Sequence, residues 1–259
     1  MMSVKRRDSI VSMLNLLKRD LEYYLLDKIS LVIFLTVFLS GLLVFLVSLK
    51  NMLGNSNNYF LFLLTGYLVV SYMNISAGAG FEIINDAYES KLTYDKTLPV
   101  ERLTYAFIRI LGISLRGYIN FILCFLIMSP LLLSFFTIEN ILVFLVLSYV
   151  LSVIFTGISI LPLRLTSNLT IQSVIGALLR SYFFLGSTIF YPLKAVPENL
   201  KFIIVLNPVT WILELIRSLM DVPYATRFPP LISILVITIY LLFSILGGIY
   251  VLLHYKIEV

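Results

Sequence analysis

The sequence predicts an all-α integral membrane protein with six transmembrane helices. Of its 259 residues, 60% are hydrophobic and only 13% are charged, whereas soluble domains carry about 25% charged residues. The apolar residues also gather in blocks of about 20 residues without charge, the length that a helix needs to cross a hydrocarbon core. Because lipid offers the backbone no hydrogen-bond partner, each block should be a helix.

Residues 1–28 are predicted to form an amphipathic helix in the membrane interface. The segment carries six Lys and Arg residues, and its apolar residues recur every three or four positions to give one face, formed by Ile10, Leu14, Leu17, Leu21 and Leu25. A helix with an apolar face and a basic polar face lies in the plane of the interface. The alternative is a helix that packs on a soluble partner.

Residues 29–259 are predicted to form one transmembrane domain. The expected spans are Ile29–Leu49, Tyr59–Ala79, Gly117–Phe136, Ile141–Leu163, Ile171–Tyr191 and Leu231–Leu253. In the sixth span, the pair Gly247-Gly248 permits close approach of a neighbouring helix.

The basic residues predict the orientation of these spans. With a cytoplasmic N-terminus, 13 of the 19 Lys and Arg residues fall on the cytoplasmic side and five on the outer side, while Arg180 lies inside the fifth span. Because short cytoplasmic loops are enriched in positive charge, both termini are expected in the cytoplasm. We expect a multi-pass protein of the plasma membrane.

Several features of other membrane proteins are missing from the sequence. No Asp or Glu lies inside an expected span, although ion-coupled carriers commonly place carboxylates there. The phosphate loop Gly-x-x-x-x-Gly-Lys-Ser/Thr and the hydrolase motifs His-Glu-x-x-His and Gly-x-Ser-x-Gly are absent too. The single Cys124 is interpreted as an apolar filler. We therefore expect no catalytic residue, metal or cofactor in this chain, which is either passive or driven by a partner.

A charged connection, residues 81–106, separates the second and third spans. A short helix over Ile84–Lys96 should end before Pro99, since the residue before a proline avoids the α region. A second helix should begin near Val100 and continue into the third span. Such an element could dock on a soluble domain and move the spans, but its charge content is equally typical of a solvated loop.

A second long connection, residues 192–230, follows the fifth span. Asn207 suits a helix N-cap, and Pro208 suits the first turn. The segments Pro197–Leu206 and Val209–Met220 are too short to cross a bilayer and too apolar to lie in water. They predict a re-entrant hairpin that dips into the outer leaflet.

Three charged side chains in this half of the chain stand out. Glu214 and Arg217 are three residues apart on the expected second hairpin helix, so they share a face and can pair; the alternative is a helix that only packs on its neighbours. Arg180 is the one charge deep within a span, where it costs roughly 2.5–3.5 kcal/mol. It should line a path or contact a lipid phosphate, unless it snorkels from a span placed in the wrong register.

The first connection resembles the cytoplasmic coupling segment of ABC-2 type ABC-transporter permeases. That family shows an acidic run, Gly-Thr-Leu, mostly apolar residues, Leu-Pro and a basic position, which correspond here to Glu89, Leu92, Tyr94, Leu98, Pro99 and Arg102. The departures are Ser90, Lys91, Asp95 and Lys96. The resemblance implies that these six residues, together with Asp86, contact an ATPase.

The second connection resembles the same family more closely. After its fifth span the family shows aromatic-Pro-Leu, Leu-Pro, an apolar stretch, Asn-Pro and a helix with Glu and Arg. The order is reproduced by Tyr191-Pro192-Leu193, Val196-Pro197, Asn207-Pro208, Glu214 and Arg217. The family's element closes the top of the translocation path. The resemblance therefore implies an outer gate of Pro192, Pro197, Asn207, Pro208, Glu214 and Arg217.

This resemblance implies the membrane subunit of an ATP-driven exporter for a lipid-like, drug-like or polymeric substrate. Two copies, or one copy and a related permease, would pair among membrane lipids, and two ATPase subunits would bind ATP and Mg²⁺ beneath them. No nucleic-acid partner is expected. The alternatives are a passive channel or ion-coupled carrier and a lipid-modifying enzyme, for which the sequence offers no acid–base constellation.

Overall fold

The structure, a computed structural model, describes residues 28–53, 57–88, 101–133, 136–166 and 168–254, with five isolated positions between residues 15 and 22. Most of the predicted interfacial helix and the coupling residues Glu89, Leu92, Tyr94, Leu98 and Pro99 lie outside these ranges. The described elements are all helical, in the order α2 (Lys28–Leu53), α3 (Asn57–Ser76), α4 (Ala79–Tyr88), α6 (Arg102–Leu133), α7 (Ile138–Ile160), η1 (Leu161–Arg164), α8 (Leu169–Leu185), η2 (Leu193–Ala195), α9 (Glu198–Val205), α10 (Pro208–Leu219) and α11 (Pro230–His254).

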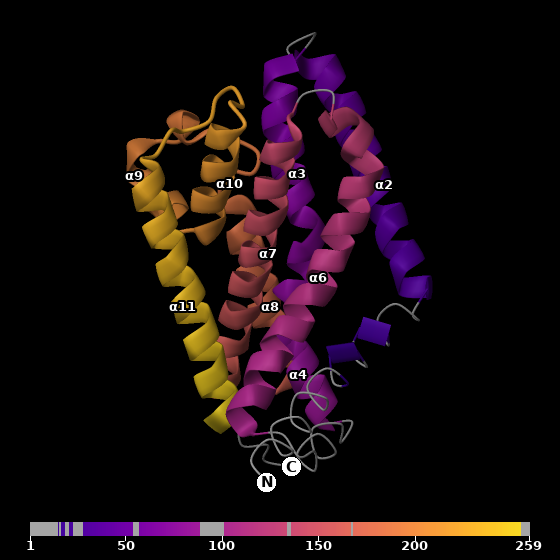
Figure 1. The fold of residues 1–259 in the computed structure, drawn as a ribbon, viewed down its shortest axis with the longest axis vertical. Helices are drawn as coiled ribbons and strands as arrows, with labels where there is room; N and C mark the ends of the chain where they lie inside the picture. Colours follow the sequence, from indigo (N-terminus) through magenta and orange to yellow (C-terminus); the bar gives the residue numbers. More distant parts are fainter. Residues whose placement is uncertain are drawn as a thin grey trace.

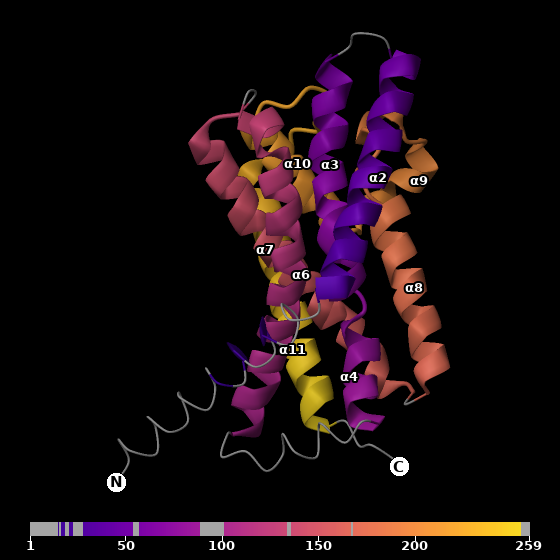
Figure 2. The same ribbon diagram turned by 90° about the vertical axis from the view of Figure 1, so that its right-hand side faces the viewer.

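The long helices run side by side along the longest axis of the molecule (Figure 1). The short helices α9 and α10 lie together at one end, here called the hairpin end, and α4 lies at the opposite end, the α4 end (Figure 1). Figure 2 shows α8 along one edge of this bundle and α2 in front of α3. The predicted all-α class is therefore confirmed.

Three helices are long and apolar enough to cross a membrane, judged over the residues that the structure describes: Arg102–Pro130, Ile138–Arg164 and Pro230–His254. The other predicted spans contain shorter apolar helices, Leu31–Val44, Tyr59–Val70 and Leu169–Leu185. Exposed leucine and isoleucine side chains line α11 and α2, as expected of surfaces that face lipid. The chain is a multi-pass membrane protein, and the number of six spans stays a prediction.

Two predicted helix boundaries are wrong. The fifth span was expected to reach Tyr191, but α8 ends at Leu185 and is capped by Gly186. The backbone that follows is not helical because its carbonyl groups serve side chains of α10, as described below. The short helix expected to begin at Ile84 begins at Ala79 instead, because its first residues pack into a hydrophobic cluster with α6 and α7.

Serine side chains join α3, α6 and α7 in the middle of the bundle. The hydroxyls of Ser76 and Ser152 lie 2.8 Å apart, and Ser152 donates to the carbonyl of Ser114 (2.8 Å). Ser159 donates to the carbonyl of Ser76 (3.0 Å). Small residues let membrane helices approach closely, and their hydroxyls bridge the backbones.

Glycines bring α7 and α11 into direct contact. A Cβ atom added to Gly157 would lie 2.3 Å from the carbonyl oxygen of Ser244, and one added to Gly248 would lie 3.5 Å from the Cα atom of Gly157. The close approach predicted from the glycine pair is thus confirmed at Gly248. At Gly247 an added Cβ would meet only the end of the Leu161 side chain, 2.8 Å away, which can rotate.

We predict that Gly157→Ala destabilises the protein while Gly247→Ala does not. The first substitution forces two helix backbones apart, and overpacking of this kind costs about 1–3 kcal/mol. The second requires only a rotamer change of one leucine. Thermal unfolding of the two variants in detergent, beside the wild type, measures the difference. Equal midpoints for the two variants would contradict the backbone contact.

Candidate functional site

The start of α10 is fixed by Asn207, as the sequence predicts. Its Oδ1 accepts from the Val209 N–H (3.0 Å), and Pro208 occupies the first turn. Its amide Nδ2 donates to the carbonyls of Tyr182 (2.9 Å) and Gly186 (2.8 Å) at the end of α8. One side chain therefore caps the start of α10 and also binds backbone carbonyl groups at the end of α8.

The helices α9 and α10 are bent by 91° relative to each other. The indole N–H of Trp211 donates to the Val205 carbonyl across the bend (2.7 Å), and the Tyr240 hydroxyl of α11 donates to the Leu206 carbonyl (2.6 Å). These bonds occupy carbonyl groups at the end of α9. The two helices predicted from the sequence are confirmed, and both are anchored to the bundle.

The two helices of the hairpin differ in burial. Every residue of α10 from Pro208 to Arg217 is buried, whereas α9 exposes apolar side chains such as Leu200 and Phe202. Pro192 and Pro197 precede η2 and α9 as their N-cap residues. The hairpin thus consists of a core helix and an outer helix with an uncovered apolar face.

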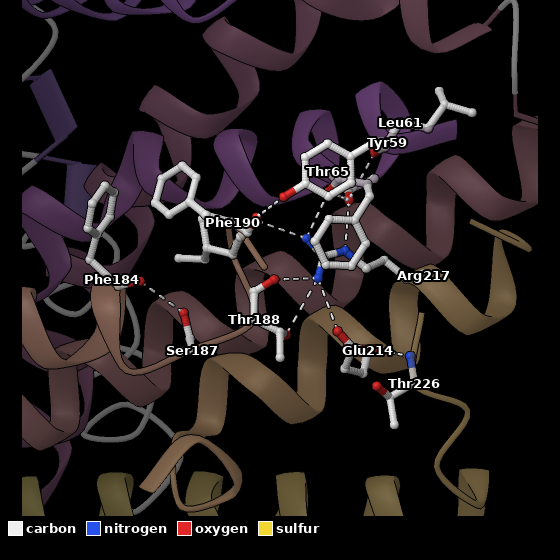
Figure 3. A network of polar contacts seen from close by, with 12 residues as sticks. Tyr59, Leu61, Thr65, Phe184, Ser187, Thr188, Phe190, Glu214, Arg217 and Thr226 are labelled. Carbon is white, nitrogen blue, oxygen red and sulfur yellow. Dashed lines mark hydrogen bonds and ion pairs between the residues drawn. The ribbon is translucent and has the colours of Figure 1, made fainter. Parts of the chain in front are cut away.

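The centre of the hairpin end is the guanidinium group of Arg217, which is completely buried (Figure 3). Nη1 donates to the Thr188 carbonyl (2.6 Å), and Nη2 donates to the carbonyls of Ile189 (3.1 Å) and Phe62 (2.8 Å). The arginine therefore joins α10 to α3 and to the non-helical loop of residues 186–192.

Side-chain groups complete the environment of Arg217. Nη1 donates to Glu214 Oε1 (3.0 Å) and Nε donates to Thr65 Oγ1 (3.1 Å), while the guanidinium carbon lies 3.6 Å from the centre of the Phe62 ring. The other Glu214 oxygen accepts from the backbone N–H of Thr226. The predicted Glu214–Arg217 pair is confirmed, and neither side chain has any solvent exposure.

The contacts of Arg217 have a structural role, because a buried charge is tolerated only when it is paired and hydrogen-bonded. All three guanidinium nitrogens already donate to groups of the same chain. Arg217 has five N–H donors in a planar fork, and they are used in contacts with three different segments. The cluster is a clasp that closes α3, the loop and α10 on one another.

Two further contacts fix the loop against α3. A Cβ atom added to Gly66 would lie 2.3 Å from the Ile189 carbonyl oxygen and 2.9 Å from Arg217 Nη2. The Tyr59 hydroxyl donates to the Phe190 carbonyl (2.7 Å). Sequence reasoning missed the roles of Tyr59 and Gly66, because their partners lie more than 100 residues away in the chain.

Arg180 lies on α8, apart from this clasp. Its side chain is half-buried, and within the described residues it has no ion pair or hydrogen bond. Elsewhere on α8, Leu178 and Leu185 are exposed. The position is compatible with a contact to lipid or to a path.

The α4 end carries two further ion pairs, Asp86–Arg109 and Glu82–Arg116. Asp86, predicted as an ATPase contact, is only 9% exposed because its carboxylate turns toward Arg109. Arg102, the first residue of α6, is exposed. Sequence reasoning used Arg109 and Arg116 only to orient the spans. Their separation by two helical turns was the signal that could have indicated a shared partner helix.

Comparison with protein families decides the class. The profile of ABC-2 type transporters matches residues 12–220, which include the first connection, the second connection as far as residue 220 and the whole of α10. The chain belongs to the ABC-2 type transporter family. It is therefore a permease subunit of an ABC transporter, as the resemblance implies. A comparison with curated proteins finds no match.

We predict that Arg217→Met strongly destabilises this ABC-2 permease. The substitution leaves the Glu214 carboxylate buried and unpaired, and breaking a buried ion pair in this way costs about 3–5 kcal/mol. Arg227→Met is the matched control, because Arg227 pairs with Asp221 where both side chains are largely exposed and exposed pairs contribute little.

Thermal unfolding in detergent and the yield of monodisperse protein measure both effects. Arg217→Lys should also lose stability, since an ammonium group cannot reproduce the planar fork of donors. An Arg217→Met variant as stable as the control would show that the clasp is dispensable.

Proposed function

We propose that this permease works with a separate ATPase as an ATP-driven exporter of a lipid-like, drug-like or polymeric substrate. The observation that carries the proposal is the family match over residues 12–220. The sequence adds support, since it contains no phosphate-binding loop and no carboxylate within the expected spans. The energy for transport is then supplied by a partner that binds ATP and Mg²⁺.

The orientation is proposed from the distribution of charge. The α4 end, with Arg102, Arg109, Arg116 and Arg164, faces the cytoplasm of a cell with this protein in its plasma membrane, and both termini lie there. The hairpin end then faces outward. The exposed apolar face of α9 suits a position in the outer leaflet.

In this orientation the α9–α10 hairpin closes the outer side of the translocation path. Asn207, Glu214 and Arg217 hold the closed hairpin rather than touch the substrate, because their polar atoms are already occupied by the chain itself. Pro192, Pro197 and Pro208 start its short helices. Arg180 faces the path or a lipid phosphate.

On the cytoplasmic side, the ATPase binds the segment between α4 and α6. The contact residues are Glu89, Leu92, Tyr94, Leu98 and Pro99, followed by Arg102 at the exposed start of α6. Two permease chains, identical or related, pair in the membrane above two ATPase subunits. Asp86 lies too deep for a direct contact and supports α4 instead.

We predict that replacing Leu92, Tyr94 and Leu98 together with aspartate abolishes co-purification with the partner ABC ATPase. Charged residues there would place desolvated carboxylates in the docking surface. The control combines Lys194→Asp with Arg227→Asp, at two exposed positions near the opposite end of the molecule. Co-purification is measured as the ratio of the two subunits after size-exclusion chromatography.

The wild type should bind the ATPase in this assay, and the Lys194→Asp, Arg227→Asp control should bind it too. Binding by the Leu92, Tyr94 and Leu98 variant at the wild-type ratio would refute the proposed contact. An ATPase that fails to bind the wild type, or transport by the permease alone in liposomes, would instead favour a passive channel.

A further inference from the structure

The ion pairs at the α4 end form a ladder between two helices. Glu82 and Asp86 are one helical turn apart on α4, and their partners Arg116 and Arg109 are two turns apart on α6. The residue number rises along α4 from the first pair to the second and falls along α6, which is the order expected of antiparallel helices. Only 7% of the Arg109 side chain and 11% of the Arg116 side chain are exposed. Separating the helices would strand charges in a poorly solvated place.

The ladder complements the packing of α4. The backbone of α4 lies closest to α7, α8 and η1, and a Cβ atom added to Gly80 would lie 2.3 Å from the Ser159 carbonyl oxygen of α7. The isoleucines Ile83 and Ile84 share a small hydrophobic cluster with Ile110 and Ile113 of α6. The arginines therefore add the polar, directional part of the contact with α6.

A short joint connects α4 to α3. Only Ala77 and Gly78 separate the two helices, and hydrogen bonds continue on both sides of the turn. The Ala77 N–H donates to the Met73 carbonyl (2.9 Å), and the Glu82 N–H donates to the Gly78 carbonyl (3.1 Å). Ala77 and Ala79 are buried. Displacement of α4 along the bundle must therefore be shared with α3.

The other end of α3 is held by the clasp. Phe62 and Thr65 accept hydrogen bonds from Arg217 of α10, 155 and 152 residues away. Almost every residue of α3 from Phe62 to Val69 is buried. By contrast, α8, which also leads from the α4 end to the hairpin end, is largely exposed, with buried residues only at Gln172, Gly176 and Phe183.

We propose that α3 and α4 together are the connecting rod that carries motion from the ATPase side to the outer hairpin. Glu82 and Asp86 fasten one end of the rod to α6, and Arg217 fastens the other end to the hairpin. The inference rests on the proposed function, because the ATPase supplies the motion. The charged residues of the rod are positioning residues, and none of them needs to touch the substrate.

The physical reason is that packed helices pass on displacement only where they cannot slide. Apolar side-chain contacts allow small shear movements between packed helices, whereas a buried ion pair has one favourable register. Buried arginines that hold α4 at one end and α3 at the other remove that freedom from the two helices together. Breaking the ion pairs between α4 and α6 should therefore stop motion from reaching the hairpin without unfolding the hairpin.

The test measures movement of the hairpin in the complex with the partner ABC ATPase. Cys124 is the one cysteine of the sequence, so Cys124→Ser provides a background for two spin labels. Val37→Cys on α2 and Phe202→Cys on α9 are suitable sites, because both side chains are more than 60% exposed. Labelled permease is diluted with unlabelled copies, and the distance is measured by pulsed electron paramagnetic resonance without nucleotide and after trapping with ATP, Mg²⁺ and orthovanadate.

Three variants are compared with the wild type. Arg109→Glu opposes Asp86 with a like charge, and the exchange Asp86→Arg with Arg109→Asp restores an ion pair of reversed polarity. Arg227→Glu applies the same charge change to an exposed pair. We expect trapping to shift the distance in the wild type, the exchange variant and the Arg227 variant. In Arg109→Glu that shift should be lost, while the ATPase still binds and hydrolyses ATP.

The possible failures are distinct. A wild-type permease that binds no ATPase overturns the proposed function and the rod with it. If the ATPase binds and hydrolyses ATP but the distance between the labels does not change in the wild type, the rod alone is overturned. The rod is also overturned if Arg109→Glu shows the same change in distance as the wild type. Loss of ATPase binding in Arg109→Glu would show that the ion pair has only a structural role. The same conclusion follows if the exchange variant does not recover the distance shift, and either result overturns the rod. Asp86→Asn, which keeps the shape of the side chain, repeats the test if Arg109→Glu does not fold.

Discussion

The burial of the Arg217 guanidinium is the constraint on which the hairpin end of this permease depends. A charge without solvent must have its N–H groups occupied, and those of Arg217 are satisfied by carbonyls of α3 and of the loop after α8, by Thr65 and by Glu214. These groups come from three separate segments, so the charge is tolerated only when all of them are in place. The early end of α8, the tight contact at Gly66 and the burial of α10 follow from this requirement.

The opposite end uses charge differently. Arg109 and Arg116 each pair with a carboxylate on α4, and the carboxylates keep some exposure to solvent. Between the two ends, helix contacts depend on serine hydroxyls and glycine backbones, as at Ser152 and Gly157. The buried ion pairs described here thus lie toward the two ends of the bundle, and small uncharged residues join its middle, where lipid makes charge expensive.

The resemblance read from short motifs and the family match agree, and the structure explains why those motifs are physically useful together. Asn207 and Pro208 start α10 in the right place, and the spacing of Glu214 and Arg217 turns both toward the same side of it. The motif therefore encodes a capped helix with one buried ion pair. The function of the motif in the transporter depends on the groups that this ion pair contacts in other segments of the chain.

The sequence by itself determined the membrane class, the two hairpin helices, the Asn207 cap and the Glu214–Arg217 pair. These features depend on composition, on helical spacing and on neighbours a few residues apart. It did not determine the end of α8, the start of α4, or the partners of Arg217 and Asp86. Only the tertiary structure decided these, because Thr65 lies 152 residues from Arg217 and a local pattern carries no information about which distant carbonyl will accept a buried N–H.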